Sequence, residues 1–252
     1  MVAFSCLAAA VFLPLFPASM LFNRLFARIG NAWVRMALLV VWPQLGLVLL
    51  AALSQRPPVW ILYWAVLTSG LYAFRALALR DLGLWTAHMA TSAWSLLWVV
   101  ALVSDNASAW FMQAAGLSAP FLLLTWLVAR LEVRFGAAYA GTCGGLAQTM
   151  PRLSLLLVIT LLAAIGTPLF PAFFTLLATV TSALPVVPGV ALSVLLVWLL
   201  WAWAGARMTR NMVVAPASAE SVPDLAGAAA APAAVVLALM MVAGVATVGY
   251  LV

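Results

Sequence analysis

The sequence predicts an all-α protein, a polytopic transmembrane helical bundle that forms a single domain over residues 1–252. Hydrophobic residues make up 68% of the chain and charged residues only 6%, with a mean hydropathy of +1.22. A soluble domain carries about 25% charged residues. Inside a bilayer every backbone polar group must be satisfied within the protein, so the apolar runs are expected to be helices.

About eight spans are expected, because the apolar runs reach the roughly 20 residues that a helix needs to cross a bilayer. The runs fall near residues 3–22, 34–54, 58–79, 83–103, 107–129, 153–184, 186–206 and 230–251. The first run has no basic residues before it, since Arg24 and Arg28 follow it. It therefore differs from a secretory signal and is expected to remain as a span.

The basic residues predict the orientation of the chain. All eleven are arginines, and ten of them fall in alternate loops, at 24, 28 and 35, at 75 and 80, at 130, 134 and 152, and at 207 and 210. The intervening loops hold only Arg56, Asp105 and Asn106. Because cytoplasmic loops carry the excess of positive charge, both termini are expected outside. Arginines spread singly over short loops do not indicate nucleic-acid binding.

The run 153–184 is long enough for one tilted span or for two short ones. Gly166, Pro168 and Pro171 interrupt it, which predicts a broken helix near 166–171. A second crossing here would give nine spans and would place the last pair of arginines outside. The charge rule therefore favours one crossing.

The segment 213–230 is rich in Ala and Pro and contains Glu220 and Asp224, which predicts a solvated linker before the last span. Cys6 and Cys143 are far apart and match no metal or redox spacing. The chain has one His, no paired carboxylates and no phosphate-binding glycine loop. We therefore expect no enzyme activity, no cofactor and no metal.

Three polar side chains within the predicted spans are candidates for a proton pathway, namely His88, Ser92 and Gln44. His88 and Ser92 lie four residues apart and so share one helix face. A histidine titrates near physiological pH; the alternative is a neutral His that is hydrogen-bonded to a neighbouring helix. Gln44 follows Pro43 in mid-span, which predicts a kink beside a polar group.

A cluster of tryptophans, Trp198, Trp201 and Trp203, lies in the last third of one run, close to Arg207. Such a cluster is typical of the aromatic belt at a membrane interface. A contact with a partner subunit is the alternative.

Several motifs follow one another along the chain: Ala78-Leu79-Arg80-Asp81-Leu82, Ala115-Gly116-Leu117-Ser118 after Gln113, Gly144-Gly145-Leu146, Met150-Pro151, Gly166-x-Pro168 and Phe173-Phe174. Over about residues 35 to 210 they resemble the proton-conducting, antiporter-like membrane subunits of respiratory complex I (NADH-quinone oxidoreductase). Relatives of those subunits serve multisubunit cation/proton antiporters, membrane-bound hydrogenases and inorganic-carbon-accumulating complexes. Family subunits are about twice as long, so the first half of their inverted repeat is expected to be absent here.

The resemblance implies a row of buried Lys, His and Glu across the membrane midplane, and the chain departs from it at each matched position. Gly83 stands where a Lys follows the family's Asp-Leu pair, and Ala115 stands where a His precedes Gly-Leu-Ser. Thr175 and Leu176 stand where a Glu or Lys follows the broken helix. An alternative register matches His88-Met89 to a family His-Met pair but loses the Asp-Leu match.

This pattern indicates an accessory or degenerate antiporter-like subunit of a larger ion-coupled complex, structural rather than proton-conducting. One alternative is a proton-coupled transporter subunit, for example for inorganic-carbon uptake, that uses His88. Another is an assembly or structural factor of a respiratory or photosynthetic supercomplex. The expected partners are other membrane subunits, the lipid bilayer and, in some such complexes, a soluble catalytic subunit. The expected location is the bacterial cytoplasmic (inner) membrane.

Overall fold

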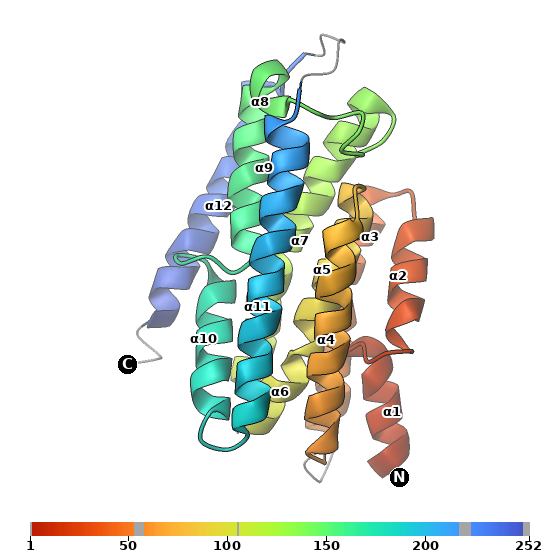
Figure 1. The fold of residues 1–252 in the computed structure, drawn as a ribbon, viewed down its shortest axis with the longest axis vertical. Helices are drawn as coiled ribbons and strands as arrows, with labels where there is room; N and C mark the ends of the chain where they lie inside the picture. The colour runs from red at the N-terminus through yellow and green to blue at the C-terminus, as the bar shows by residue number, and fades with distance from the viewer. Residues whose placement is uncertain (1, 53–57, 105, 217–222, 249–252) are drawn as a thin grey trace.

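The computed structural model describes residues 2–52, 58–104, 106–216 and 223–248 (Figure 1). These residues form twelve α-helices and one short π-helix, without a strand. Their bounds are α1 Val2–Phe12, α2 Ser19–Arg28, α3 Ala32–Ala51, α4 Trp60–Ala78, α5 Leu82–Ser95, α6 Leu97–Val103, α7 Ala107–Phe135, α8 Leu146–Thr149, α9 Pro151–Ala164, α10 Pro171–Ala183, α11 Pro188–Thr209, η1 Arg210–Val214 and α12 Gly227–Val248. The predicted all-α class is confirmed.

The helices form an upright bundle of membrane crossings. Six helical stretches are long and apolar enough to cross a membrane: α3, α4, α5 with α6, α7, α11 with η1, and α12. Two more crossings are each built from two short helices that follow one another in the same direction, α1 with α2 and α9 with α10 (Figure 1). Counted in this way, the described residues make eight crossings, in line with the expectation of about eight.

The first crossing is broken, and the prediction of one continuous span over 3–22 is wrong. α1 ends at Phe12, and α2 begins only at Ser19. Pro14 and Pro17 lie between them. A proline has no N–H to donate and its ring clashes with the preceding turn, so a helix cannot continue through this pair.

The crossing near 153–184 is broken where the sequence predicts it. α9 ends at Ala164, and Gly166 then takes a positive φ of 72°, a conformation that glycine adopts without steric cost. Pro171 begins α10, a position where a proline ring is already set for the helix and its missing N–H costs nothing. The chain continues downward after the break, so the two short helices form one crossing (Figure 1).

The described arginines gather at one end of the bundle. They lie in the C-terminal parts of α2, α4, α7 and α11, at the start of η1, on the first turns of α3 and α9, and in the connection before α5. All of these ends are in the upper part of Figure 1, whereas α1 begins at the bottom. Arg56 and Asp105 lie outside the described residues.

The connection before α12 is attached to this end. The predicted linker 213–230 starts inside η1 and ends inside α12. Arg134 Nε donates to Pro223 O at 3.3 Å. The Asp224 carboxylate accepts from Arg152 N at 2.8 Å and from the next backbone N–H at 3.3 Å. A carboxylate that accepts from the first N–H groups of a helix stabilises that helix end.

The core surrounds α5 and α6, and 83% of this stretch is buried inside the protein. α2, α4 and α7 pack against α5. Ala87, Ala90 and Ala93 are fully buried on it. Small residues let helix backbones approach closely in a membrane, where packing rather than water exclusion drives association.

Candidate functional site

Trp198 closes the break between α9 and α10. Its indole N–H donates to Ile165 O and to Gly166 O, each at 3.1 Å. Backbone carbonyls left without a donor in a bilayer interior cost several kcal/mol each. The carbonyls of the break would also stabilise a cationic side chain. Here the neutral indole of Trp198, from α11, takes that position.

Two glycines of neighbouring helices also pack directly against this break. A Cβ on Gly244 of α12 would overlap Leu169 O and lie 2.8 Å from Leu169 C. A Cβ on Gly116 of α7 would lie 2.9 Å from Pro171 Cβ. Both contacts are shorter than the optimal carbon–carbon separation of about 3.5–4.0 Å. α12 and α7 thus leave no room for a side chain at these points.

The break between α1 and α2 is closed in the same way. Its carbonyls accept hydrogen bonds from side chains of α3, α4, α5 and α6, as follows: Val11 O from Trp42 at 3.1 Å, Leu13 O from Trp98 at 3.0 Å, Pro14 O from Ser95 at 2.7 Å and Phe16 O from Trp64 at 2.7 Å. Three indoles and one hydroxyl thus replace the helix ladder. Both breaks are satisfied by uncharged groups.

Four residues stand where the resembled family has buried charges, namely Gly83, Ala115, Thr175 and Leu176. They do not lie in one continuous row of contacting side chains. Thr175 and Leu176 are buried near the start of α10, 6% and 1% exposed. Leu176 packs toward Gly166, where an added Cβ would meet its Cδ1 at 2.9 Å. Ala115 is exposed on α7, and Pro168 is exposed in the break.

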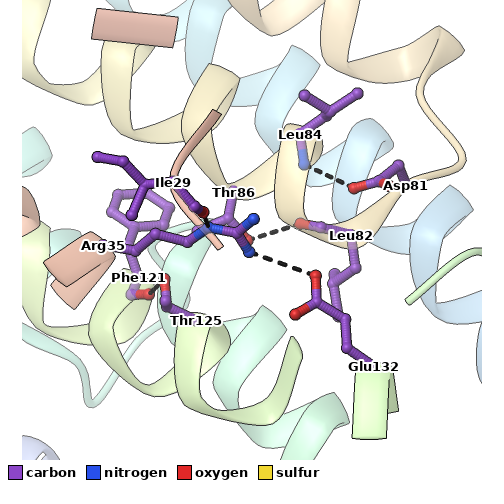
Figure 2. A network of polar contacts seen from close by, with 9 residues as sticks. All are labelled: Ile29, Arg35, Asp81, Leu82, Leu84, Thr86, Phe121, Thr125 and Glu132. Carbon is purple, nitrogen blue, oxygen red and sulfur yellow. Dashed lines mark hydrogen bonds and ion pairs between the residues drawn. The ribbon is translucent and has the colours of Figure 1, made fainter. Parts of the chain in front are cut away.

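Gly83 lies beside the one ion pair found among the described residues, shown in Figure 2. Arg35 Nη1 is 3.3 Å from Glu132 Oε1, and Arg35 Nε donates to Ile29 O at 2.5 Å. A Cβ on Gly83 would be 3.2 Å from Asp81 Oδ1 and 4.0 Å from Arg35 Nη1. The positive charge near Gly83 is therefore the guanidinium of Arg35, which comes from α3, and not a side chain of α5.

His88 is buried between α4 and α5. Its Nδ1 donates to Leu84 O at 2.9 Å, and its ring lies 5.3 Å from that of Tyr72, centroid to centroid. Tyr72 in turn shares a hydrogen bond with Ser19 of α2, 2.9 Å between the oxygens. No carboxylate within the described residues pairs with His88. This geometry suits a neutral imidazole whose proton is held by its own helix.

Ser92 has a structural role between three helices. Ser92 and Ser69 hydroxyls each donate to the other's carbonyl at 2.8 Å. Trp201 Nε1 donates to Ser92 Oγ at 2.8 Å. The hydrogen-bonding capacity of Ser92 is thus used to join α4, α5 and α11.

Gln44 is separate from these groups. Its Nε2 donates to Phe111 O at 3.4 Å, and its Oε1 is buried without a partner within the described part of the chain. No hydrogen bond in that part joins Gln44 to His88 or Ser92. The three proton-pathway candidates therefore do not form one connected chain.

The described residues contain no group of three or more His, Cys, Asp or Glu placed to hold a metal. Cys143 lies in the loop after α7 and donates to Ala137 O at 3.3 Å. Burial raises the pKa of its thiol above the ordinary value, which disfavours the reactive thiolate.

Two of the three tryptophans near Arg207 are not belt residues. Trp201 is fully buried, and Trp198 binds the break, whereas Trp203 is 60% exposed. The role of Trp198 has a signal in the sequence. A predicted helix break leaves backbone carbonyls that need donors, and a nearby tryptophan can supply an N–H donor without charge.

Comparison with solved structures shows which known proteins share this fold. A chain of respiratory complex I from Thermus thermophilus with bound NADH matches 99% of this chain with a TM-score of 0.89 and 22% identity. A chain of the membrane-bound sulfane sulfur reductase, an archaeal respiratory membrane complex, matches 99% with a TM-score of 0.82 and 20% identity. A chain of the Mrp complex from Dietzia sp. matches 97% with a TM-score of 0.84 and 16% identity.

The match covers 55%, 53% and 56% of those three chains, so this chain spans about half their length. No family model matches the sequence. No curated protein matches it. The predicted resemblance to antiporter-like membrane subunits is confirmed at the level of the fold, which this chain shares with chains of these three complexes.

Proposed function

We propose that this chain is a membrane subunit of a larger ion-coupled, energy-converting complex. The support is the fold, since the chains that share it belong to complex I, to an archaeal respiratory membrane complex and to the Mrp complex. Its partners would be other membrane subunits and, in a complex of the respiratory type, a soluble catalytic subunit. The chain itself would not be an enzyme.

Within such a complex we assign the chain a structural rather than a proton-conducting role. Among the described residues, every Arg, Asp and Glu lies within about two turns of a helix end or in a connection. Among the same residues, His88 lies farthest from a helix end, six residues from the start of α5, whereas Arg130 lies five residues from the end of α7. Because ionisable groups inside a membrane are costly, they normally mark ion and proton pathways.

The observation that carries this role is the closure of the broken helix. Trp198 occupies the two carbonyls of the break, and Thr175 and Leu176 bring no charge to it. A break that is kept but filled by neutral groups is explained by packing. It needs no ion.

The test is a pull-down of the tagged full chain from native membranes in mild detergent, with co-purifying proteins identified by mass. The proposal expects a stable set that includes a full-length antiporter-like subunit or a large soluble enzyme. Recovery of the chain alone, folded and at full yield, would contradict the assembly role.

The arginine distribution supports an inner-membrane orientation with the arginine-rich end in the cytoplasm and both termini outside.

An assembly factor of a supercomplex would have the same fold and charges. The pull-down distinguishes it, because its partners would change with the stage of assembly.

A conducting subunit is the second candidate. It is favoured by the surroundings of His88, whose ring packs against Tyr72, which in turn shares a hydrogen bond with Ser19 of α2. In that case the native chain should conduct protons and replacement of His88 by Ala should abolish the flux, whereas a structural role predicts no flux in either protein.

A further inference from the structure

An open-sided cavity of about 500 Å³ lies between α6, α7, α10 and α12, beside the start of α10 that follows the break. Its wall includes Pro171 and Thr175 at the start of α10 and Ser104 at the end of α6. This volume is within the range of about 300–1,000 Å³ that small-molecule sites occupy.

The polar side chains of the wall are neutral among the residues that the structure describes. Hydroxyls of Thr175, Thr179 and Ser182 line one side, and the amide of Gln113 lines the other. No charged side chain is present on the wall in the described part of the chain. An ion that gave up its hydration shell to bind these wall groups would meet no opposite charge from them, which is unfavourable.

Gln113 offers the clearest recognition group. Its Oε1 is buried and has no hydrogen-bond partner in the described protein. A buried polar atom without a partner costs about 1–3 kcal/mol. A ligand with an O–H or N–H group could therefore gain free energy by satisfying this amide after a small rotation of the side chain. The Thr175 hydroxyl, across the cavity on α10, can donate to an acceptor of the same ligand.

From these features we propose that the cavity is a binding site for a small neutral molecule with hydrogen-bond donors and acceptors, such as a polyol or an amide, and that it excludes ions. Gln113 and Thr175 are the recognition residues. This assignment does not depend on the role of the chain in a complex.

The test uses thiol reagents as probes of known charge. Single cysteines replace Thr175 inside the cavity, Ser182 at its exposed rim, and Thr160 on the far side of the break, where the native side chain is fully buried. The background carries Cys6→Ala and Cys143→Ala. Neutral methyl methanethiosulfonate is compared with its cationic trimethylammonium and anionic sulfonate analogues, and modification is followed by intact mass.

The expected result is a preference for the neutral reagent at Thr175→Cys that exceeds the preference at Ser182→Cys at least tenfold. Normalisation to the rim position removes the intrinsic reactivity of the reagents. Equal preferences at the two positions would show that ions enter. Thr175→Cys as unreactive as Thr160→Cys would show that nothing enters. Either result overturns the proposal.

Recognition is tested with glycerol as the ligand. Glycerol should slow the neutral modification of Thr175→Cys but not that of Ser182→Cys, and Gln113→Leu should remove most of this protection. Protection that is undiminished in Gln113→Leu would refute the role of the amide. The thermal unfolding of each variant confirms that it is folded.

Discussion

The contact between Gly244 and the broken helix allows a sharp test of how α12 is held. A Cβ on Gly244 would overlap Leu169 O and lie 2.8 and 2.9 Å from the carbonyl carbons of Leu169 and Phe170. These distances are roughly 0.6–0.7 Å short of an optimal carbon–carbon contact. The atoms met are backbone atoms, which cannot rotate away as the end of a side chain can.

The matched control is Gly70→Ala in α4. A Cβ there would lie 3.8 Å from Val197 Cγ2, which is an ordinary van der Waals contact. Both substitutions gain the same helix preference of Ala over Gly, about 0.5–1 kcal/mol, so their difference isolates the clash. Overpacking a close-packed site costs about 1–3 kcal/mol, so Gly244→Ala should be less stable than Gly70→Ala by about this amount.

The assay is unfolding of the purified chain by SDS in mild detergent, followed by tryptophan fluorescence. Equal stabilities of the two variants would show that α12 does not pack on the break. That result would refute the account of how the break is enclosed.

Three further predictions concern groups outside this contact. Trp198→Phe should lower the free energy of unfolding by about 1–3 kcal/mol, because it leaves two buried carbonyls without a donor. The control Trp203→Phe, at an exposed site, should change it by less than about 0.5 kcal/mol. Equal effects in SDS titration would refute the role of Trp198 in closing the break between α9 and α10. Asp224→Ala should cost about 1 kcal/mol through loss of the cap on α9, and unchanged protection of the Arg152 amide in hydrogen exchange would contradict that cap. Because burial raises the pKa of Cys143, its alkylation at pH 8 should be slower in the folded protein than in SDS and should accelerate toward higher pH; equal rates in both states would argue against burial.

The sequence was sufficient for the features that depend on composition and on backbone chemistry. The class follows from hydropathy, and the break at Gly166 follows from residues that cannot continue a helix. The same chemistry was present at Pro14 and Pro17, where a break was not predicted. The apolar run around those prolines is long enough for one span, and length outweighed the proline signal.

The pairing of polar groups could not be predicted, because it depends on how distant helices are placed against one another. Ser69 and Ser92 meet only because α4 and α5 pack at one depth, and Trp201 reaches them from α11. Ser92 as a proton-pathway residue and Gln113 as part of a cavity wall both depend on this packing. Sequence spacing defines a helix face but not the neighbour that covers it.

The proposed structural role requires that the chain keeps an antiporter-like fold without conducting protons. Its most direct test is proton flux into liposomes that contain the purified chain, driven by a membrane potential and reported by a pH-sensitive dye. We expect the proton flux to be no greater than in empty liposomes, both for the native chain and for His88→Ala. Flux in the native chain that His88→Ala abolishes, with both proteins equally folded, would contradict it.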